Sequence, residues 1–158
     1  GRAVAVVAIL SPGCEWGRNL IESDRLLAAY SAGQRGSELP VVGVYGNKNR
    51  VKCERILRGE KFSAVVPAKT SPKVTAFYRC ILNPSDSSHV VIDRHAKAAA
   101  VNLRSKRKGF ASDDKLSLVT RAEYDWLAAH YSKLAEKFGL VPSQIQAIIW
   151  TCWKEKVN

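Results

Sequence analysis

The amino-acid sequence predicts an all-α protein, and two observations support this prediction. Apolar residues recur three and four positions apart over most of the chain, which places them on one face of a helix. Ser, Thr or Asp stands where these periodic segments begin, and Gly or Asn-Pro stands where they end. Together the segments indicate roughly seven to nine short helices. Residues 3–10 are ambiguous, because a short apolar run fits either a helix or a buried strand.

The first half of the chain begins with a turn at Ser11-Pro12-Gly13 and continues into a predicted helix. The apolar positions of that helix are Leu20, Ile21, Leu26, Leu27 and Tyr30. Residues 31–40 have the composition of a loop. A second helix follows Gly46-Asn47 and stops at Gly59, with a predicted inward face of Val51, Cys53, Ile56 and Leu57. Its predicted outward face is the basic series Lys48, Arg50, Lys52 and Arg55.

A short linker then leads to a helix that Ser71 can cap and Asn83-Pro84 ends. Val90, Val91 and Ile92 return the chain to the interior, and Asp93 is placed to cap the next helix. Thr120 and Glu123 form a capping box. The helix that they open buries Tyr124, Leu127, Ala128, Tyr131, Leu134 and Phe138, and Gly139 closes it. A last helix starts at Pro142 with Ile145, Ile148, Ile149 and Cys152 on one face.

The length of 158 residues suits one domain of two small helical lobes with a cleft between them. The predicted lobes are residues 20–90, and residues 1–19 with 91–158. The four cysteines are widely scattered, which predicts reduced thiols in an intracellular protein, in the cytoplasm or nucleoid of a bacterial or virus-infected cell. The abrupt apolar beginning suggests a trimmed N-terminus. No run is long enough to span a bilayer.

The positive charge is concentrated in one segment. Residues 48–108 hold 15 Lys or Arg and 4 Asp or Glu, which gives this segment the whole net charge of +11. A solvated face normally mixes both signs, so the segment predicts a polyanionic partner, most often nucleic acid. An anionic membrane is less well supported, because these cations do not lie opposite one clean apolar face. The cluster from Arg104 to Lys108 fits a solvated loop and a DNA-backbone contact equally well.

The chemistry that the residues support is narrow. No metal-ligand cluster, Walker A loop or nucleophile elbow is present, so the sequence predicts neither a metal nor another cofactor. The strongest candidate is the Asp93 carboxylate, beside Arg94 and His95 at the end of an apolar segment. On spacing alone, Asp93 is a plain helix cap and His95 a surface or half-buried histidine. In a basic cleft, a carboxylate can stabilise a cationic sugar while a glycosidic bond breaks, and a lysine can attack the sugar instead.

Four stretches resemble the helix-hairpin-helix-GPD superfamily of DNA glycosylases, of the endonuclease III type. Residues 6–11, Val-Val-Ala-Ile-Leu-Ser, are similar to the apolar helix that opens the family's core. Residues 43–57 resemble its Gly-hydrophobic-Tyr-x-x-Lys-Ala helix, and residues 67–81 stand where the hairpin and its lysine-bearing helix belong. Val-Ile-Asp-Arg-His at 91–95 is similar to the Val-Asp-Thr-His signature.

The resemblance implies that Asp93 is the essential carboxylate, that Lys73 is a Schiff-base lysine, and that a monomer flips a nucleotide out of double-stranded DNA. The predicted DNA-binding residues are Lys48, Arg50, Lys69, Thr70, Ser71, Arg94, Lys106, Arg107 and Lys108. The predicted base-pocket residues are Trp16, Tyr45, His95 and Gln146.

This sequence departs from the family pattern in several places. Ala68 and Ser71 stand near positions where the hairpin usually has Gly, and Gly13 stands where many members have a Gln that fills the gap left by the flipped base. The iron–sulfur cysteines are absent. These departures indicate a divergent, viral branch. Two alternatives therefore stay open: a phage enzyme that modifies thymine bases by displacing pyrophosphate, and a non-catalytic DNA-binding module in which Asp93 only caps a helix.

Overall fold

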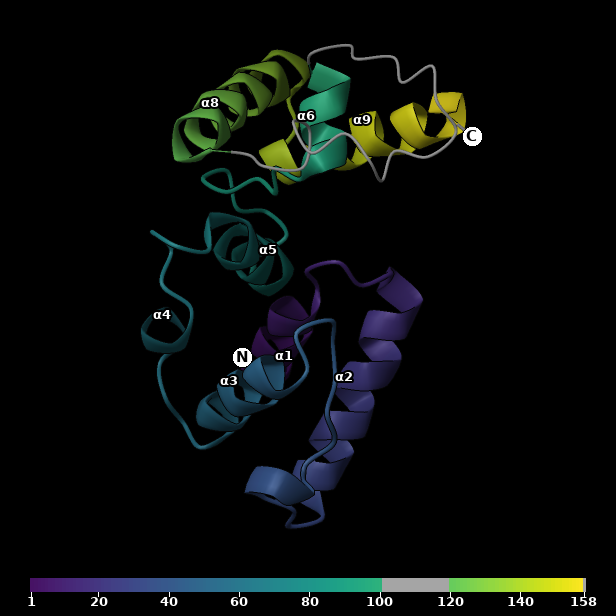
Figure 1. Cartoon of the computed structure of the whole chain (residues 1–158). Coiled ribbons are helices and arrows are strands. Elements are labelled where there is room, and N and C mark those ends of the chain that lie inside the picture. Colours follow the sequence, from purple (N-terminus) through teal and green to yellow (C-terminus); the bar gives the residue numbers. More distant parts are fainter. Residues whose placement is uncertain (101–119, 158) are drawn as a thin grey trace. The chain divides into compact units, whose positions relative to one another are not determined.

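The chain is helical in the part that the computed structural model describes, which is residues 1–100 and 120–157 (Figure 1). The elements are α1 (Arg2–Leu10), α2 (Trp16–Ser31), the 3₁₀ turn η1 (Gly36–Glu38), α3 (Asn47–Leu57), α4 (Phe62–Val65), α5 (Pro72–Leu82), α6 (Arg94–Ala100), α8 (Arg121–Phe138) and α9 (Pro142–Val157). These residues contain no strand, so the all-α prediction is confirmed. Residues 3–10 belong to a helix.

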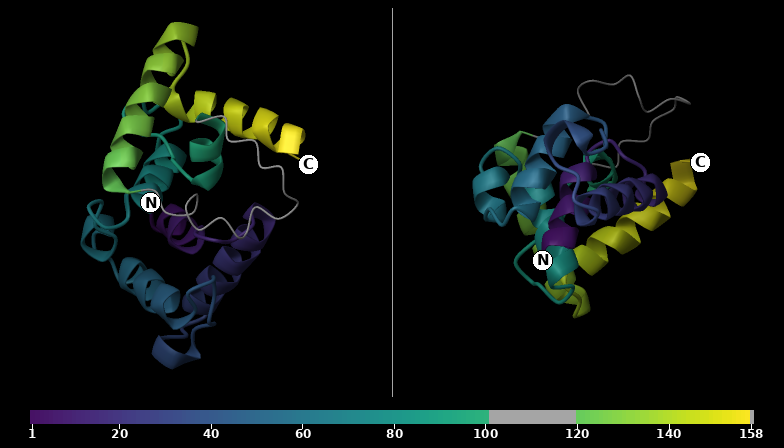
Figure 2. Two further views of the ribbon diagram at one scale, coloured as in Figure 1. Left: turned by 45° about the horizontal axis from the view of Figure 1, so that its top comes forward. Right: turned by 90° about the horizontal axis from the view of Figure 1, so that it is seen from below.

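Two compact units divide the chain, Gly1–Leu82 and Asn83–Asn158. The sequence-based division differs, because it assigned residues 1–19 to the second lobe. The structure joins α1 to the first unit, where it packs against α2, α3 and α5. In the second unit, α9 packs against both α6 and α8 (Figure 2).

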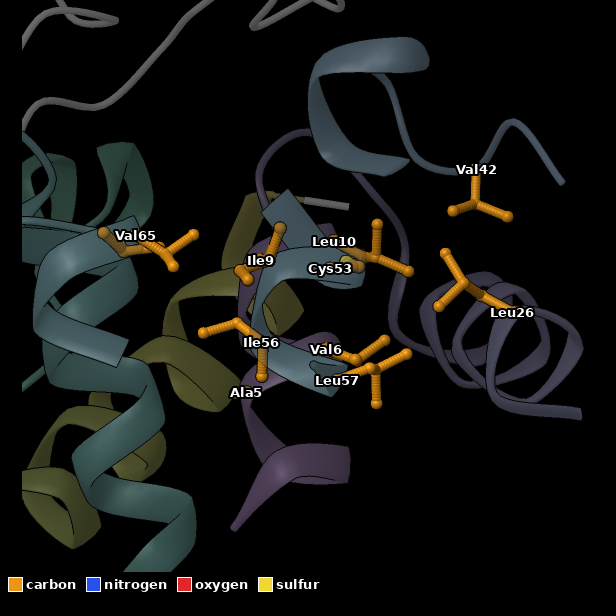
Figure 3. Packing of buried hydrophobic residues seen from close by; sticks show 11 residues of the cluster. Ala5, Val6, Ile9, Leu10, Leu26, Val42, Cys53, Ile56, Leu57 and Val65 are labelled. Carbon is orange, nitrogen blue, oxygen red and sulfur yellow. The ribbon is translucent and has the colours of Figure 1, made fainter. Parts of the chain in front are cut away.

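The core of the first unit is built around α1. Figure 3 shows Leu10 of α1 and Leu26 of α2 together with Val42 from the loop before α3. Cys53 of α3 is fully buried in the same cluster, and burial raises the pKa of its thiol to about 12. The Cys53 thiol therefore stays protonated and packs as a small apolar group. No disulfide joins the four cysteines, all of which lie in the described residues.

The inward face of α2 is partly polar, which the sequence reading did not predict. Leu20 and Ile21, two of the apolar positions that indicated this helix, are exposed. Asn19 and Ser23 are buried in their place. The Asn19 amide donates to the Val7 carbonyl oxygen at 3.1 Å, and the Ser23 hydroxyl donates to the Asn19 side chain at 3.1 Å. Because these polar groups are paired, their burial is tolerated.

The face of α3 is also rotated from the prediction. Asn49, Cys53, Ile56 and Leu57 are buried, whereas Val51 is half exposed. The buried positions follow a spacing of four, three and one residues, which keeps them on one side of the helix and turns Val51 outward. Hydrophobicity alone had placed Val51 inward and left Asn49 out.

The close approach of Gly43 to Asn49 explains a glycine in the loop before α3. Gly43 has a φ of +70°, and a Cβ built on it would lie 2.3 Å from Asn49 Nδ2. That amide nitrogen is buried and finds no hydrogen-bond partner among the described residues. The site therefore excludes a side chain at position 43 both by backbone conformation and by contact.

We expect Gly43→Ala to destabilise the protein by about 2–4 kcal/mol, since it adds backbone strain to a clash. In an Asn49→Ala background the same substitution should cost only about 1–2 kcal/mol, because the clash with Asn49 is gone, while the backbone strain and the approach of Leu10 Cδ2 at 3.0 Å remain. Urea unfolding of the four proteins measures both values. Equal costs in the two backgrounds would show that Asn49 is not the obstacle.

The helices of the second unit confirm the predicted ends and correct the predicted faces. The Thr120 hydroxyl accepts the Glu123 amide at 3.2 Å, the Glu123 carboxylate accepts the Thr120 amide at 2.9 Å, and Gly139 has a φ of +64°. Ala135 is buried where Phe138 was expected, and Phe138 is exposed. In α9 the buried residues include Ile145 and Trp153, whereas Ile148 and Cys152 are exposed. Trp126 of α8 is also exposed.

Candidate functional site

Asp93 lies at the junction between a buried segment and α6. Val90 and Ile92 are almost fully buried, and Asp93 is half-buried. One carboxylate oxygen, Oδ1, accepts the Ala96 amide at 2.8 Å, and the Asp93 carbonyl accepts the Lys97 amide at 2.9 Å. The predicted cap is therefore confirmed. Oδ1 therefore fixes the carboxylate against the start of α6, and no hydrogen bond among the described residues engages Oδ2.

Two tyrosines of α8 reach the backbone on either side of Asp93. The Tyr124 hydroxyl donates to the Val90 carbonyl oxygen at 2.8 Å and lies 3.5 Å from the Ile92 amide, which points a proton at it. The Tyr131 hydroxyl donates to the Ala96 carbonyl oxygen at 3.0 Å. Burial and, to a lesser extent, the Asp93 charge raise the pKa of Tyr131 to about 12. The sequence analysis predicted both tyrosines to be buried but assigned them no role in the site. A buried phenol hydroxyl needs a hydrogen-bond partner, so a tyrosine at a core position indicates a polar group close to it.

His95 and Gln146, two of the predicted pocket residues, lie on helices that pack together. The His95 ring meets the Trp150 ring edge-on, with a centroid distance of 6.2 Å and an interplanar angle of 90°. Gln146 precedes Trp150 by one turn of α9. Arg94 is exposed and its Nε lies 3.4 Å from His95 Nε2. Trp150, which no sequence pattern connected to the candidate site, therefore belongs to the surroundings of His95.

The other two predicted pocket residues, Trp16 and Tyr45, belong to the first unit. Trp16 is exposed and contacts Phe77 edge-on at a centroid distance of 6.1 Å. Tyr45 is exposed on the loop that leads into α3, together with Val44. Val44 lies against Gly13, since a Cβ at position 13 would come within 3.3 Å of it. The pairing of Trp16 and Tyr45 with His95 and Gln146 stays a prediction.

A carboxylate of α2 braces the Tyr45 loop. Glu22 accepts the Gly43 amide and pairs with Arg18 at 2.6 Å. The Arg18 hydrogen bond and then the Gly43 amide lower the pKa of Glu22. The brace therefore needs an ionised carboxylate and connects α2 to the loop that presents Val44 and Tyr45.

Because the pKa of Glu22 is lowered in the folded state, its contribution to stability is present above the unfolded value of about 4.3 and is lost as the pH falls through the folded value. We expect Glu22→Gln to destabilise the protein by about 1–2 kcal/mol at pH 7. The difference from the wild type should shrink below about pH 4. Urea unfolding at pH 7 and pH 3.5 tests this. A constant difference would mean that Glu22 ionisation has no part in the brace.

The basic side chains of α3 border a surface hollow of about 410 Å³ lined by Asn47, Lys48, Val51, Lys52 and Arg55. Lys48 is exposed there. Arg55 pairs with Glu60 at 2.7 Å. Arg50 was predicted on the same face but turns away, since its Nη1 donates to the Ser37 carbonyl oxygen at 3.4 Å and its Nε is buried. Lys48 therefore lies exposed at the hollow, whereas Arg50 instead holds η1.

The predicted hairpin is a tight turn between α4 and α5. The Pro67 carbonyl accepts the Thr70 amide at 3.1 Å, the Ser71 amide at 3.0 Å and the Thr70 hydroxyl at 3.2 Å. Thr70 and Ser71 were predicted to bind DNA, but the turn itself uses their backbone amides. Any phosphate contact at this turn therefore depends more on the exposed Lys69 side chain than on these amides.

The remaining predicted residues are in two places. Lys73 is half-buried in the first turn of α5 and belongs to the first unit, whereas Asp93 belongs to the second. Lys106, Arg107 and Lys108 lie outside the described residues.

Within the described part of the chain, no helix is long and apolar enough to cross a membrane. The same residues contain no group of three or more His, Cys, Asp or Glu arranged to hold a metal ion.

The fold and the candidate site thus define a basic, all-α protein of two units with a capped carboxylate in the second. The chain belongs to DUF7178, a family of unknown function, whose family model matches residues 1–157. No curated protein and no solved structure matches the chain.

Proposed function

We propose that this protein is a DNA N-glycosylase that flips a damaged or modified base and cleaves its glycosidic bond with Asp93. The observation that carries the proposal is the geometry of that carboxylate. Its Oδ1 is held by the Ala96 amide, and the buried segment before it fixes its position. The positive excess of residues 48–108 supports a DNA partner.

In the proposed reaction, the C–N bond between the sugar and the base breaks with its electron pair going to the base. The ionised carboxylate of Asp93 stabilises the positive charge that develops on the sugar. Water then supplies a hydroxyl group to C1′ and a proton to the base. If Lys73 is the nucleophile instead, its neutral amine attacks C1′, and the base leaves with the electron pair of the C–N bond and takes up a proton from the amine. The C1′–O4′ bond then opens, O4′ becomes a hydroxyl group, and C1′ and the lysine nitrogen are left as a Schiff base that borohydride traps.

The test is release of free base from duplex DNA that carries a panel of modified bases, with nucleosides identified by mass spectrometry. We expect a free base and an abasic site. A heavier nucleoside would replace the proposal with the base-modifying alternative. If the protein binds DNA but changes no base of the panel, the result would support the alternative of a non-catalytic DNA-binding module.

A further inference from the structure

The position of Asp93 depends on more than its own helix. In proteins, most of the stability of a helix such as α6 comes from packing against other elements rather than from the helix itself. Four of its residues are alanines, which offer little side-chain area for packing. The orientation of the Ala96 amide, and with it the Asp93 carboxylate, must therefore be fixed by contacts from other elements.

The tyrosine hydroxyls of α8 supply such contacts. Tyr124 and Tyr131 are seven residues apart, so they lie on the same face of α8, about 10 Å apart along its axis. Tyr124 holds Val90 before Asp93, and Tyr131 holds Ala96 after it. Ala96 is shared between two bonds, since its amide donates to Asp93 and its carbonyl accepts from Tyr131.

We propose that Tyr131, assisted by Tyr124, is a positioning residue that holds the Ala96 amide on the Asp93 carboxylate and so aims that carboxylate at the sugar. This inference rests on the proposed glycosylase function for its catalytic consequence. It does not rest on that function for its structural part, which is the Tyr131–Ala96–Asp93 chain of hydrogen bonds.

The chemistry of the phenol suits this task. Its raised pKa keeps Tyr131 protonated, and therefore a donor, throughout the pH range of an enzyme assay. Phenylalanine fills nearly the same volume, so Tyr131→Phe removes the hydrogen bond with little change in packing. Tyr30→Phe in the first unit is the matched control, because it also removes one phenolic hydroxyl, from a ring that packs under Arg35.

The first measurement is single-turnover base release. A misplacement of about 1 Å in a catalytic group can cost on the order of 10²-fold in rate. We expect Tyr131→Phe to lower the catalytic rate roughly 10- to 100-fold with DNA affinity unchanged, and Tyr30→Phe to leave both unchanged. An unchanged rate in Tyr131→Phe would overturn the proposal.

A double-mutant cycle shows whether Tyr131→Phe acts by displacing the Asp93 carboxylate or by destabilising the second unit as a whole. In an Asp93→Asn background, Tyr131→Phe should not reduce the residual rate further, because the group that it positions has lost its charge. An equal reduction in both backgrounds would show that Tyr131 acts independently of Asp93 and would contradict the proposal.

The structural part is tested without substrate by amide hydrogen exchange followed by NMR. Tyr131→Phe should speed exchange of the Ala96 amide roughly tenfold, and Tyr30→Phe should not. Unchanged Ala96 exchange would overturn the inference even if the protein releases bases. Faster exchange in a protein that releases no base would refute the glycosylase function and retain the structural part.

Discussion

Asp93→Asn is expected to slow base release by about 10³-fold or more while folding and DNA binding are retained. The carboxylate is the only group in the proposed reaction that offsets the positive charge developing on the sugar. Asparagine has nearly the same shape but no charge. The measurement is the single-turnover rate on a duplex whose base the wild type removes.

Because Asp93 also caps α6, the substituting residue determines whether the charge alone or both the charge and the cap are removed. Asparagine caps helices about as well as aspartate, so its side-chain oxygen can still accept the Ala96 amide. Asp93→Ala removes both the charge and the cap and should cost about 0.5–2 kcal/mol of stability. If Asp93 is only a cap, Asp93→Asn keeps the wild-type rate and Asp93→Ala lowers stability alone.

Local sequence signals predicted the ends of elements well. Thr120 with Glu123, Gly139 and Asp93 were each expected at a helix boundary, and each makes the predicted cap. Capping depends on residues within a few positions of one another, so a single stretch of sequence contains the whole signal. The carboxylate at the candidate site could therefore be placed at a helix start without the structure.

The faces of the helices were harder to predict because they depend on distant partners. Asn19 is buried because the Val7 carbonyl oxygen, twelve residues earlier, accepts its amide. Asn49 is buried against Gly43, and Val51 is turned outward as a result. A rule that buries the more apolar residue misses such positions, since pairing with distant groups decides which polar side chains can enter a core.

The same limitation applies to the candidate site. The hydroxyls of Tyr124 and Tyr131 act across more than thirty residues of sequence, so no local pattern connects them to the backbone around Asp93. Likewise, the sequence gives the number of basic residues in α3 but does not distinguish those that face solvent from those that contact the protein itself. Lys48 faces the surface hollow, whereas Arg50 is occupied by the Ser37 carbonyl oxygen. Charge predicted a polyanionic partner, and contacts decide which cations are available to bind it.

The double substitution Lys48→Ala/Lys69→Ala is expected to weaken DNA binding by roughly 50-fold at 0.1 M salt. Each phosphate contact contributes about 0.9 to the slope of log affinity against log salt, so removing two contacts lowers the slope by about 1.8. Both lysines are exposed, one on α3 and one in the turn before α5. Fluorescence anisotropy with a duplex between 50 and 300 mM salt gives the affinity and the slope together.

Lys133→Ala/Lys137→Ala is the matched control for this pair. Both residues are exposed on α8 and lie outside the basic segment 48–108. The two double variants have the same net charge, so a general effect of charge would weaken both equally. If the segment 48–108 is the DNA-binding surface, only the first pair lowers the slope. Equal slopes in the two variants would mean that binding follows net charge rather than these two contacts, and the assignment of Lys48 and Lys69 would be wrong.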